Sequence, residues 1–256
     1  MAKCVLSAME DSSEKGNSIY SFENFMTFEG NMIAHNAAKS IAYGNSNAYN
    51  PLFIYGGSGT GKTHLLKAIE ETISSHEKEK SILYITAEEF KNDVMTAGES
   101  GDSYGMAMVR EIYRNADVLL IDDIQNLTGE ENALKEMTYT IDSLMRKGSK
   151  IVISASVPPK KLNMDEQIRY KMGKGLVIEI KTPNSSLKNS LIRVKAGEHG
   201  VILQDDVVDY ITSNTGSNIS EIESAITSIV AYSELSRPVI NLKTAQKILK
   251  DILIGK

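Results

Sequence analysis

The chain has 256 residues, a formal net charge of -5 and a pI of about 5.5, with 41% hydrophobic and 24% charged residues. This composition is ordinary for a globular protein of one large or two modest domains. The acidic balance argues against strong non-specific DNA binding, which needs clustered lysines and arginines. The single cysteine, Cys4, excludes a disulfide framework and a thiolate metal site. Neither a signal peptide nor an apolar run of roughly 18 residues is found, so we expect a cytoplasmic protein without membrane contact.

The start of the chain combines a polar stretch with a repeated aromatic residue. Residues 1–20 are rich in Ser, Asp, Glu and Gly and have no hydrophobic period, which predicts a mobile arm. Phe22, Phe25 and Phe28 then recur at every third position. They either form an apolar cluster that docks the arm onto the domain or cover an adenine base, and the pattern leaves both possibilities open. Asn31 is positioned to cap the helix that follows.

Residues 51–65, PLFIYGGSGTGKTHL, are the most informative stretch. A short apolar strand leads into a glycine-rich turn that matches G-x-x-x-x-G-K-[ST], and a helical period follows. Glycines let successive backbone N–H groups point at phosphate oxygens, the lysine adds a positive charge, and the threonine hydroxyl can ligate Mg²⁺. The sequence therefore predicts a nucleoside triphosphate site. The residues that we expect to contact the nucleotide here are Gly57, Gly59, Thr60, Gly61, Lys62, Thr63 and His64.

A second acidic element completes this site. The apolar stretch DVLLIDD predicts a strand that ends in Asp122 and Asp123. Because a phosphate-binding loop needs a carboxylate for its metal, we expect Asp122 to ligate Mg²⁺ together with Thr63. Asp123 is the candidate catalytic group that orients or deprotonates the attacking water.

The rest of the chain predicts an α/β fold followed by a helical segment. Strands are expected at 81–87, 117–123, 150–154 and 176–180, with helices between them. Capping boxes of the S/T-x-x-E type lie at 86–89 and 128–131, and the helices that they open are expected to end at Gly98 and Gly148. This alternation predicts a five-stranded parallel sheet covered by helices within residues 21–182. Beyond Pro183 only helical patterns remain, so residues 183–256 are expected to form a small all-α lid domain.

Several of these stretches together resemble the AAA+ ATPase domain of the DnaA family of bacterial replication initiators. AYNPLFIYGGSGTGKTHLL, DVLLIDDIQNL, IVISASVPP and SNISEIESAITSIVAYS follow in the family's order over about 20–254. The resemblance implies a P-loop NTPase that binds ATP or ADP with Mg²⁺. It also places the phenylalanine-rich start and Asn31 beside the adenine, and it likens residues 88–114 to the helical insertion peculiar to initiators.

At several positions that are functional in the family, this chain has a different residue. The arginine finger that acts on a neighbouring subunit falls on Lys171, our second catalytic candidate, and the sensor arginine of the lid falls on Ser220. Lysine keeps the charge but loses the bidentate fork of arginine. Serine carries no charge, and we leave open whether another basic residue, such as Arg193, reaches the phosphate. Other departures are Ser156, where the family has an aspartate, and Glu130 and Asn132, where it has basic residues for single-stranded DNA.

Two functions are consistent with these observations. The first is an ATP-dependent assembly switch in the initiation of replication, which assembles with itself or with an initiator through the AAA+ interface. The alternative is a regulatory homologue or helicase-loader-like adaptor that contacts an initiator or helicase and binds little DNA. The family's C-terminal helix-turn-helix domain does not occur in the 256 residues, so this sequence is either a portion of a longer protein or belongs to one without that domain.

Overall fold

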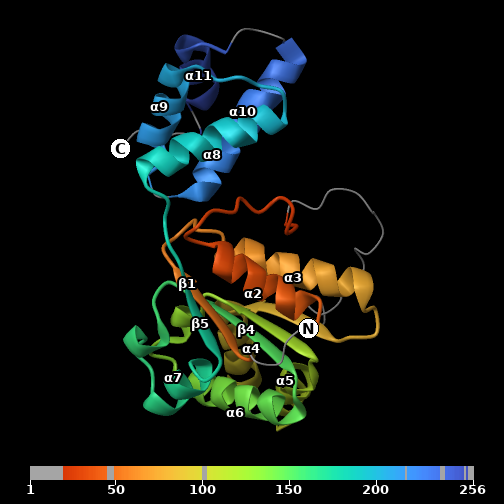
Figure 1. Cartoon of the computed structure of the whole chain (residues 1–256). Coiled ribbons are helices and arrows are strands. Elements are labelled where there is room, and N and C mark those ends of the chain that lie inside the picture. Colours follow the sequence, from red (N-terminus) through yellow and green to blue (C-terminus); the bar gives the residue numbers. More distant parts are fainter. Residues whose placement is uncertain are drawn as a thin grey trace.

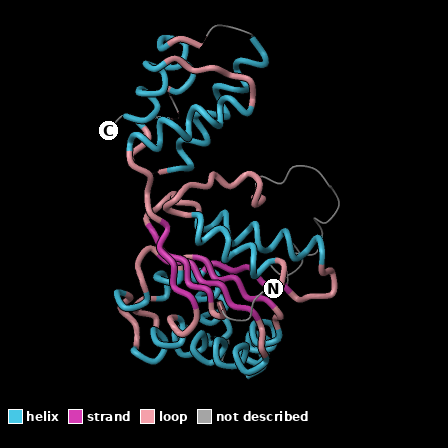
Figure 2. Tube along the Cα trace, viewed as in Figure 1, coloured by secondary structure: helices cyan, strands magenta, loops and turns pink. Residues whose placement is uncertain are grey.

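The computed structural model describes residues 20–44, 49–99, 103–216, 218–236, 240–250 and 252. An α/β part carries the parallel sheet, and a helical part lies above it in Figures 1 and 2. Apart from Tyr20, the predicted arm of residues 1–20 lies outside the described residues. No helix in the described ranges is both long enough and apolar enough to cross a membrane.

The sheet has five parallel strands in the order β2-β3-β4-β1-β5. The strands are β1 (Leu52–Gly56), β2 (Ile82–Thr86), β3 (Val118–Asp122), β4 (Lys150–Ala155) and β5 (Leu176–Ile180). The predicted five-stranded parallel α/β fold is thereby confirmed. The carboxyl ends of β1 and β3 lie on the two sides of β4, which brings the glycine loop and the acidic strand end to one edge of the sheet.

Helices cover both faces of the sheet (Figure 1). Residues of one strand alternate between the two faces, so Leu52 and Ile54 join one core cluster and Phe53 joins the other. The first face is covered by α2 (Met32–Ala42) and α3 (Lys62–His76), and the second by α4 (Ala87–Glu99), α5 (Ser103–Asn115) and α6 (Glu131–Lys147). Because both faces are buried, the strands are continuously apolar rather than alternating.

The helical part has its own apolar core. It consists of α8 (Ser185–Glu198), α9 (Asp205–Asn214), α10 (Ile219–Ser236) and α11 (Leu242–Leu249). Met26 and Phe28, from the segment before α2, are buried in this core, whereas Phe22 and Phe25 are buried in the core of the α/β part. The phenylalanine segment therefore joins the two parts. The division into domains 21–182 and 183–256 remains a prediction.

Several local predictions can be compared with the structure. The capping box at the start of α4 is confirmed, because Thr86 N donates to Glu89 Oε2 at 2.9 Å and Glu89 N donates to Thr86 Oγ1 at 3.1 Å. Gly98 was expected to end α4 but lies inside it. The expected capping box of residues 128–131 is wrong, since Glu130 is the N-cap of α6 and makes no side-chain capping bond.

Three helical segments of the α/β part were not predicted. They are the 3-10 helices η1 (Ile124–Leu127) and η2 (Pro159–Lys161) and the short helix α7 (Glu166–Met172). Each is too short to show a full hydrophobic period in the sequence.

Candidate nucleotide-binding site

The glycine loop joins the end of β1 to the start of α3. Gly59 and Gly61 have φ angles of 67° and 93°, a left-handed conformation that side chains rarely adopt. A Cβ atom on Gly61 would lie 2.6 Å from Cε2 of Phe25, so the phenylalanine segment approaches the loop too closely for any other residue. The loop therefore needs glycine for its backbone geometry and for its contact with Phe25.

Lys62 is the first residue of α3 and lies against the loop that precedes it. Its Nζ donates to the carbonyl oxygens of Gly56 at 3.0 Å and Gly57 at 2.8 Å. Burial lowers the pKa of the ammonium group, and the nearby carboxylates of Asp123 and Asp122 oppose this shift. The positive charge is thus held by dipoles and carboxylates at the mouth of the loop, where an anion would be its natural partner.

Asp122 gathers three hydroxyl groups at the end of β3. Its Oδ2 accepts from Thr63 Oγ1 at 2.7 Å and from the Tyr84 hydroxyl at 2.9 Å, and its Oδ1 accepts from Ser154 Oγ. Desolvation and the Asp122 carboxylate raise the pKa of Tyr84, so the phenol stays a proton donor. The threonine hydroxyl and the carboxylate are oxygen donors of the kind that Mg²⁺ prefers, and one or two protein ligands are enough because phosphate and water complete its shell. These residues therefore fit a Mg²⁺ ion.

Asp123 adopts an unusual backbone conformation and is held by its neighbours. Its φ angle is 54°, the one positive value among the described non-glycine residues. Its backbone N–H donates to Ser154 Oγ at 2.8 Å, and its Oδ1 accepts from Gln125 Nε2 at 2.9 Å. Gln125 is fixed in turn by the backbone N–H of Ser156 at 3.0 Å. The Asp123 carboxylate is therefore oriented by Gln125, and Asp123 lines the cleft described next.

A cleft of about 1100 Å³ runs between the glycine loop and the helical part. One wall is the phosphate-binding loop, a second is the phenylalanine segment, and the third is the cleft-facing side of α10. Among the lining residues are Asn24, Phe25, Met26, Thr60, Lys62, Thr63, His64, Asp123, Gln125, Ser156, Lys195, His199, Ser220, Glu223 and Thr227. The cleft thus has a charged end at the loop, with Lys62 and Asp123, and an apolar and aromatic end at the phenylalanine segment.

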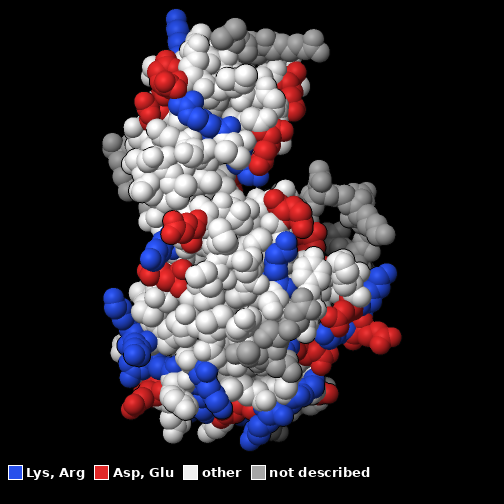
Figure 3. All heavy atoms as spheres, viewed as in Figure 1, with Lys and Arg blue, Asp and Glu red and all other residues white. Residues whose placement is uncertain are grey.

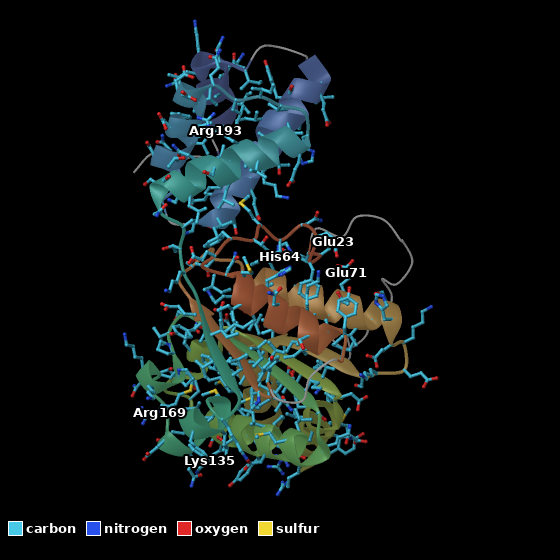
Figure 4. All side chains as sticks on the ribbon, in the orientation of Figure 1. Glu23, His64, Glu71, Lys135, Arg169 and Arg193 are labelled. Atoms are coloured by element: carbon cyan, nitrogen blue, oxygen red, sulfur yellow. The ribbon has the colours of Figure 1, made fainter. Side chains whose placement is uncertain are left out.

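His64 stands at the aromatic end of the cleft. Its Nε2 lies 2.8 Å from the carbonyl oxygen of Ser21, and its ring contacts Phe25 edge-on with 5.3 Å between the ring centroids. Burial lowers the pKa of His64, although the Ser21 carbonyl opposes this shift. Figure 4 shows His64 on the upper side of α3, below the helical part. The histidine therefore presents a neutral, aromatic surface to a ligand.

The helical part touches the phosphate-binding loop directly. The backbone N–H of Ile219 donates to the carbonyl oxygen of Gly59 at 2.9 Å. The space that a Cβ on Gly59 would need is taken by the amide of Asn218. The first turn of α10, with Ser220 in it, therefore lies at the loop.

Other predicted residues have different positions. The Asn31 amide accepts from Phe28 N at 2.8 Å and donates to the Met26 carbonyl at 2.9 Å, and Asn31 does not line the cleft. The expected side-chain cap is wrong, because this amide holds the phenylalanine segment instead. Lys171 also lies outside the cleft and pairs with Asp142 at 2.6 Å.

The alternative that Arg193 reaches the phosphate is not supported. Arg193 pairs with Asp205 at 2.6 Å and donates to the Leu203 carbonyl at 3.2 Å, within the helical part (Figure 4). Sequence reasoning missed Lys195 and Glu223 in the cleft wall, as well as Gln125 and Tyr84 around the two aspartates. For Glu223, its place three residues after Ser220 on the predicted lid helix was a usable signal.

The glycine loop, the two aspartates at the carboxyl end of β3 and the helical part beside them define a P-loop nucleotide-binding protein of the AAA+ type. Comparison with known proteins specifies the family. A family model described as the bacterial DnaA ATPase domain matches residues 17–179. The chain belongs to this family.

Individual relatives agree with this assignment. The chromosomal replication initiator protein DnaA of Chloroflexus aurantiacus is 37% identical over 238 residues, which are 93% of this chain and 49% of that protein. DnaA of Lachnoclostridium phytofermentans is also 37% identical, with 93% and 52% covered. The chain thus spans about half the length of the curated relatives it matches.

Solved structures show the same similarity. Domain III of the Thermotoga maritima replication initiation protein DnaA has a TM-score of 0.79 at 33% identity, covering 94% of this chain and 100% of that one. AMPPCP-bound DnaA from Aquifex aeolicus has a TM-score of 0.75 at 29% identity, covering 92% and 71%. A DnaA structure bound to AMPPCP and single-stranded DNA has a TM-score of 0.74 at 29% identity, covering 86% and 69%. These findings favour the replication-initiator family over the adaptor alternative.

Proposed function

We propose that this chain is the ATP-binding switch domain of a replication initiator of the DnaA family. The observation that carries the proposal is the hydrogen bond of 2.7 Å between Thr63 Oγ1 and Asp122 Oδ2, directly beneath the glycine loop. It brings the hydroxyl of the glycine-loop motif and the carboxylate at the end of β3 to the place where a phosphate-bound Mg²⁺ would need them. The relatives bound to AMPPCP support an ATP ligand.

Some residues of the cleft would bind the nucleotide, and others would take part in its hydrolysis. The backbone N–H groups of the loop, the N-terminus of α3 and the Lys62 ammonium would hold the phosphates. Thr63 and Asp122 would hold Mg²⁺, which neutralises phosphate charge when bound. Asp123, oriented by Gln125, would accept the proton of the attacking water.

Hydrolysis is expected to be slow in the isolated chain. An arginine finger contributes about 10³ to 10⁵ in rate in related phosphoryl-transfer proteins. At the corresponding position this chain has Lys171, which lies outside its own cleft and pairs with Asp142. Rapid turnover is therefore expected only with a neighbouring subunit. We infer that ATP binding, rather than hydrolysis, is the signal for assembly through the AAA+ interface.

We expect this domain by itself to bind DNA weakly. Glu130 is the N-cap of α6, and its carboxylate lies 3.9 Å from the Lys91 ammonium, so the family's basic DNA-contacting position is here an acid. Figure 3 shows Lys and Arg mixed with Asp and Glu on the face in view. Binding of single-stranded DNA with a submicromolar Kd at 150 mM salt and a steep salt dependence would contradict this expectation.

The test of ATP binding is calorimetry of Lys62→Ala. We expect nucleotide binding to be lost, because the substitution removes the one charged side chain held at the loop carbonyls, while the fold is retained. Lys78→Ala, an exposed lysine after α3, is the matched control and should bind ATP like the parent. Equal ATP affinity of Lys62→Ala and the parent would refute the phosphate-binding role of the loop.

A further inference from the structure

The cleft contains one carboxylate to which neither the fold nor the proposed function gives a role. Glu223, on α10, is half-buried and lines the cleft. Its carboxylate makes no hydrogen bond or ion pair with any described residue, whereas the nearby Glu221 accepts from Asn218 Nδ2 at 3.1 Å. Desolvation raises the pKa of Glu223, and the Lys195 ammonium only partly opposes this shift. A ligand that displaces water from this carboxylate must supply hydrogen-bond donors in its place, because an unpaired buried carboxylate costs free energy.

The geometry of α10 determines how far Glu223 lies from the phosphate-binding loop. The hydrogen bond of Ile219 N to Gly59 O fixes the first turn of α10 at the phosphate-binding loop. An α-helix rises about 1.5 Å per residue, so Glu223 lies roughly 4.5 Å farther along the axis than Ser220, and Thr227 roughly 10.5 Å farther. The apolar residues Ile226 and Val230 line the cleft beyond Glu223.

The groups that line the cleft therefore change in character along α10. Next to the glycine loop it is suited to phosphate, and one turn later it offers the Glu223 carboxylate. Farther on, Ile226 and Val230 provide apolar surface among the hydroxyl groups of Ser224, Thr227 and Ser228. A nucleoside triphosphate has its own groups in the same order: phosphates, a ribose with two hydroxyl donors, and a flat base. Lys195 cannot serve the ribose as an acceptor, because an ammonium group only donates, and it pairs with Glu198 at 2.9 Å.

We propose that Glu223 accepts a hydrogen bond from a ribose hydroxyl group of the bound nucleotide and so selects against nucleotides that lack this hydroxyl. This inference rests on the proposed ATP site and adds a specificity-determining residue to it. A site that hydrogen-bonds a substrate hydroxyl rejects the analogue without it, because the buried partner is then left unpaired. When Glu223 is ionised, this partner is charged, and the selection is stronger.

The test compares four nucleotides by calorimetry with the 256-residue chain: ATP, 2′-deoxy-ATP, 3′-deoxy-ATP and ITP. In the parent, at least one deoxy analogue should bind about tenfold or more weakly than ATP, the usual scale for a hydrogen bond to a charged group. In Glu223→Ala this ratio should fall to within about twofold, mainly because ATP binds less tightly. Glu223→Gln should lie between the two. Glu234→Gln, an exposed glutamate on the same helix, is the control and should behave like the parent.

The outcomes separate this inference from the proposed function. Equal binding of ATP and both deoxy analogues by the parent would overturn the inference. It would also be overturned if Glu223→Ala changed the ratio of ATP to ITP and left the deoxy ratios unchanged, since the carboxylate would then read the 6-amino group of the base. Failure of the parent to bind any nucleotide would instead contradict the proposed function. If Glu223→Ala does not fold, the isosteric Glu223→Gln decides, and an unchanged deoxy ratio in that variant overturns the inference.

Discussion

Ser154 is the residue whose loss should best reveal how the two aspartates are held. It is fully buried on β4, its hydroxyl donates to Asp122 Oδ1, and its Oγ accepts from the Asp123 backbone N–H at 2.8 Å. In Ser154→Ala that N–H loses its acceptor, at a cost of about 1–3 kcal/mol, and Asp122 loses a hydrogen bond of the charged class, about 1.5–3 kcal/mol. Asp122 keeps Thr63 and Tyr84 as partners, so we expect a total loss of about 3 kcal/mol.

Urea denaturation of the nucleotide-free chain measures this loss. In this variant the hydrolysis rate should fall by a larger factor than the ATP affinity. The reason is that the serine no longer holds the backbone of Asp123 at its positive φ angle. Ser190→Ala removes an exposed hydroxyl that bonds only within its own helix, and it is the matched control. A loss of unfolding free energy for Ser154→Ala no larger than that of the control, below about 0.5 kcal/mol, would refute the reasoning.

Three further predictions concern the cleft. Asp123→Asn should lower the hydrolysis rate about 10² to 10⁴-fold, which is the range for a general base. It should change the ATP affinity by less than about threefold. An unchanged rate in single-turnover assays would exclude Asp123 as the base. The parent should bind ATP and ADP with similar affinity, because Ser220 offers at most a neutral hydrogen bond to the γ-phosphate, and Ser220→Arg should raise the affinity ratio about tenfold. A large ratio in the parent would contradict this account. The pKa of Glu223 is raised, so the folded chain binds the proton of this carboxyl group more readily than the unfolded chain does. Ionisation of Glu223 therefore lowers the free energy of unfolding as the pH rises from the pKa of the unfolded chain through that of the folded chain. Glu223→Gln should therefore be no less stable than the parent near pH 4 and more stable at pH 8 in paired urea titrations, and a stability difference independent of pH would contradict the assigned shift.

The sequence by itself determined the type of fold and the centre of the site. The glycine loop, Lys62, Thr63 and the two aspartates are identified by local patterns, because phosphate binding needs a particular backbone curve and metal binding needs oxygen donors at a strand end. Continuous apolar strands that alternate with amphipathic helices likewise specify a parallel sheet. The order of the five strands does not follow from these patterns, because it depends on which strands pair in space.

Only the tertiary structure decided what surrounds that centre. Tyr84 lies 38 positions before Asp122 in the chain, yet its hydroxyl reaches the Asp122 carboxylate because β2 and β3 are neighbours in register. Asn31 was assigned to the adenine by resemblance, and the structure shows its amide hydrogen-bonded to Phe28 and Met26 of the phenylalanine segment. Glu223 became a candidate only when the contact of α10 with Gly59 placed its unpaired carboxylate in the cleft. The helical spacing from Ser220 indicates only the face of α10 on which Glu223 lies. The contacts themselves depend on distances between elements far apart in the chain, and no periodicity of the sequence encodes such distances.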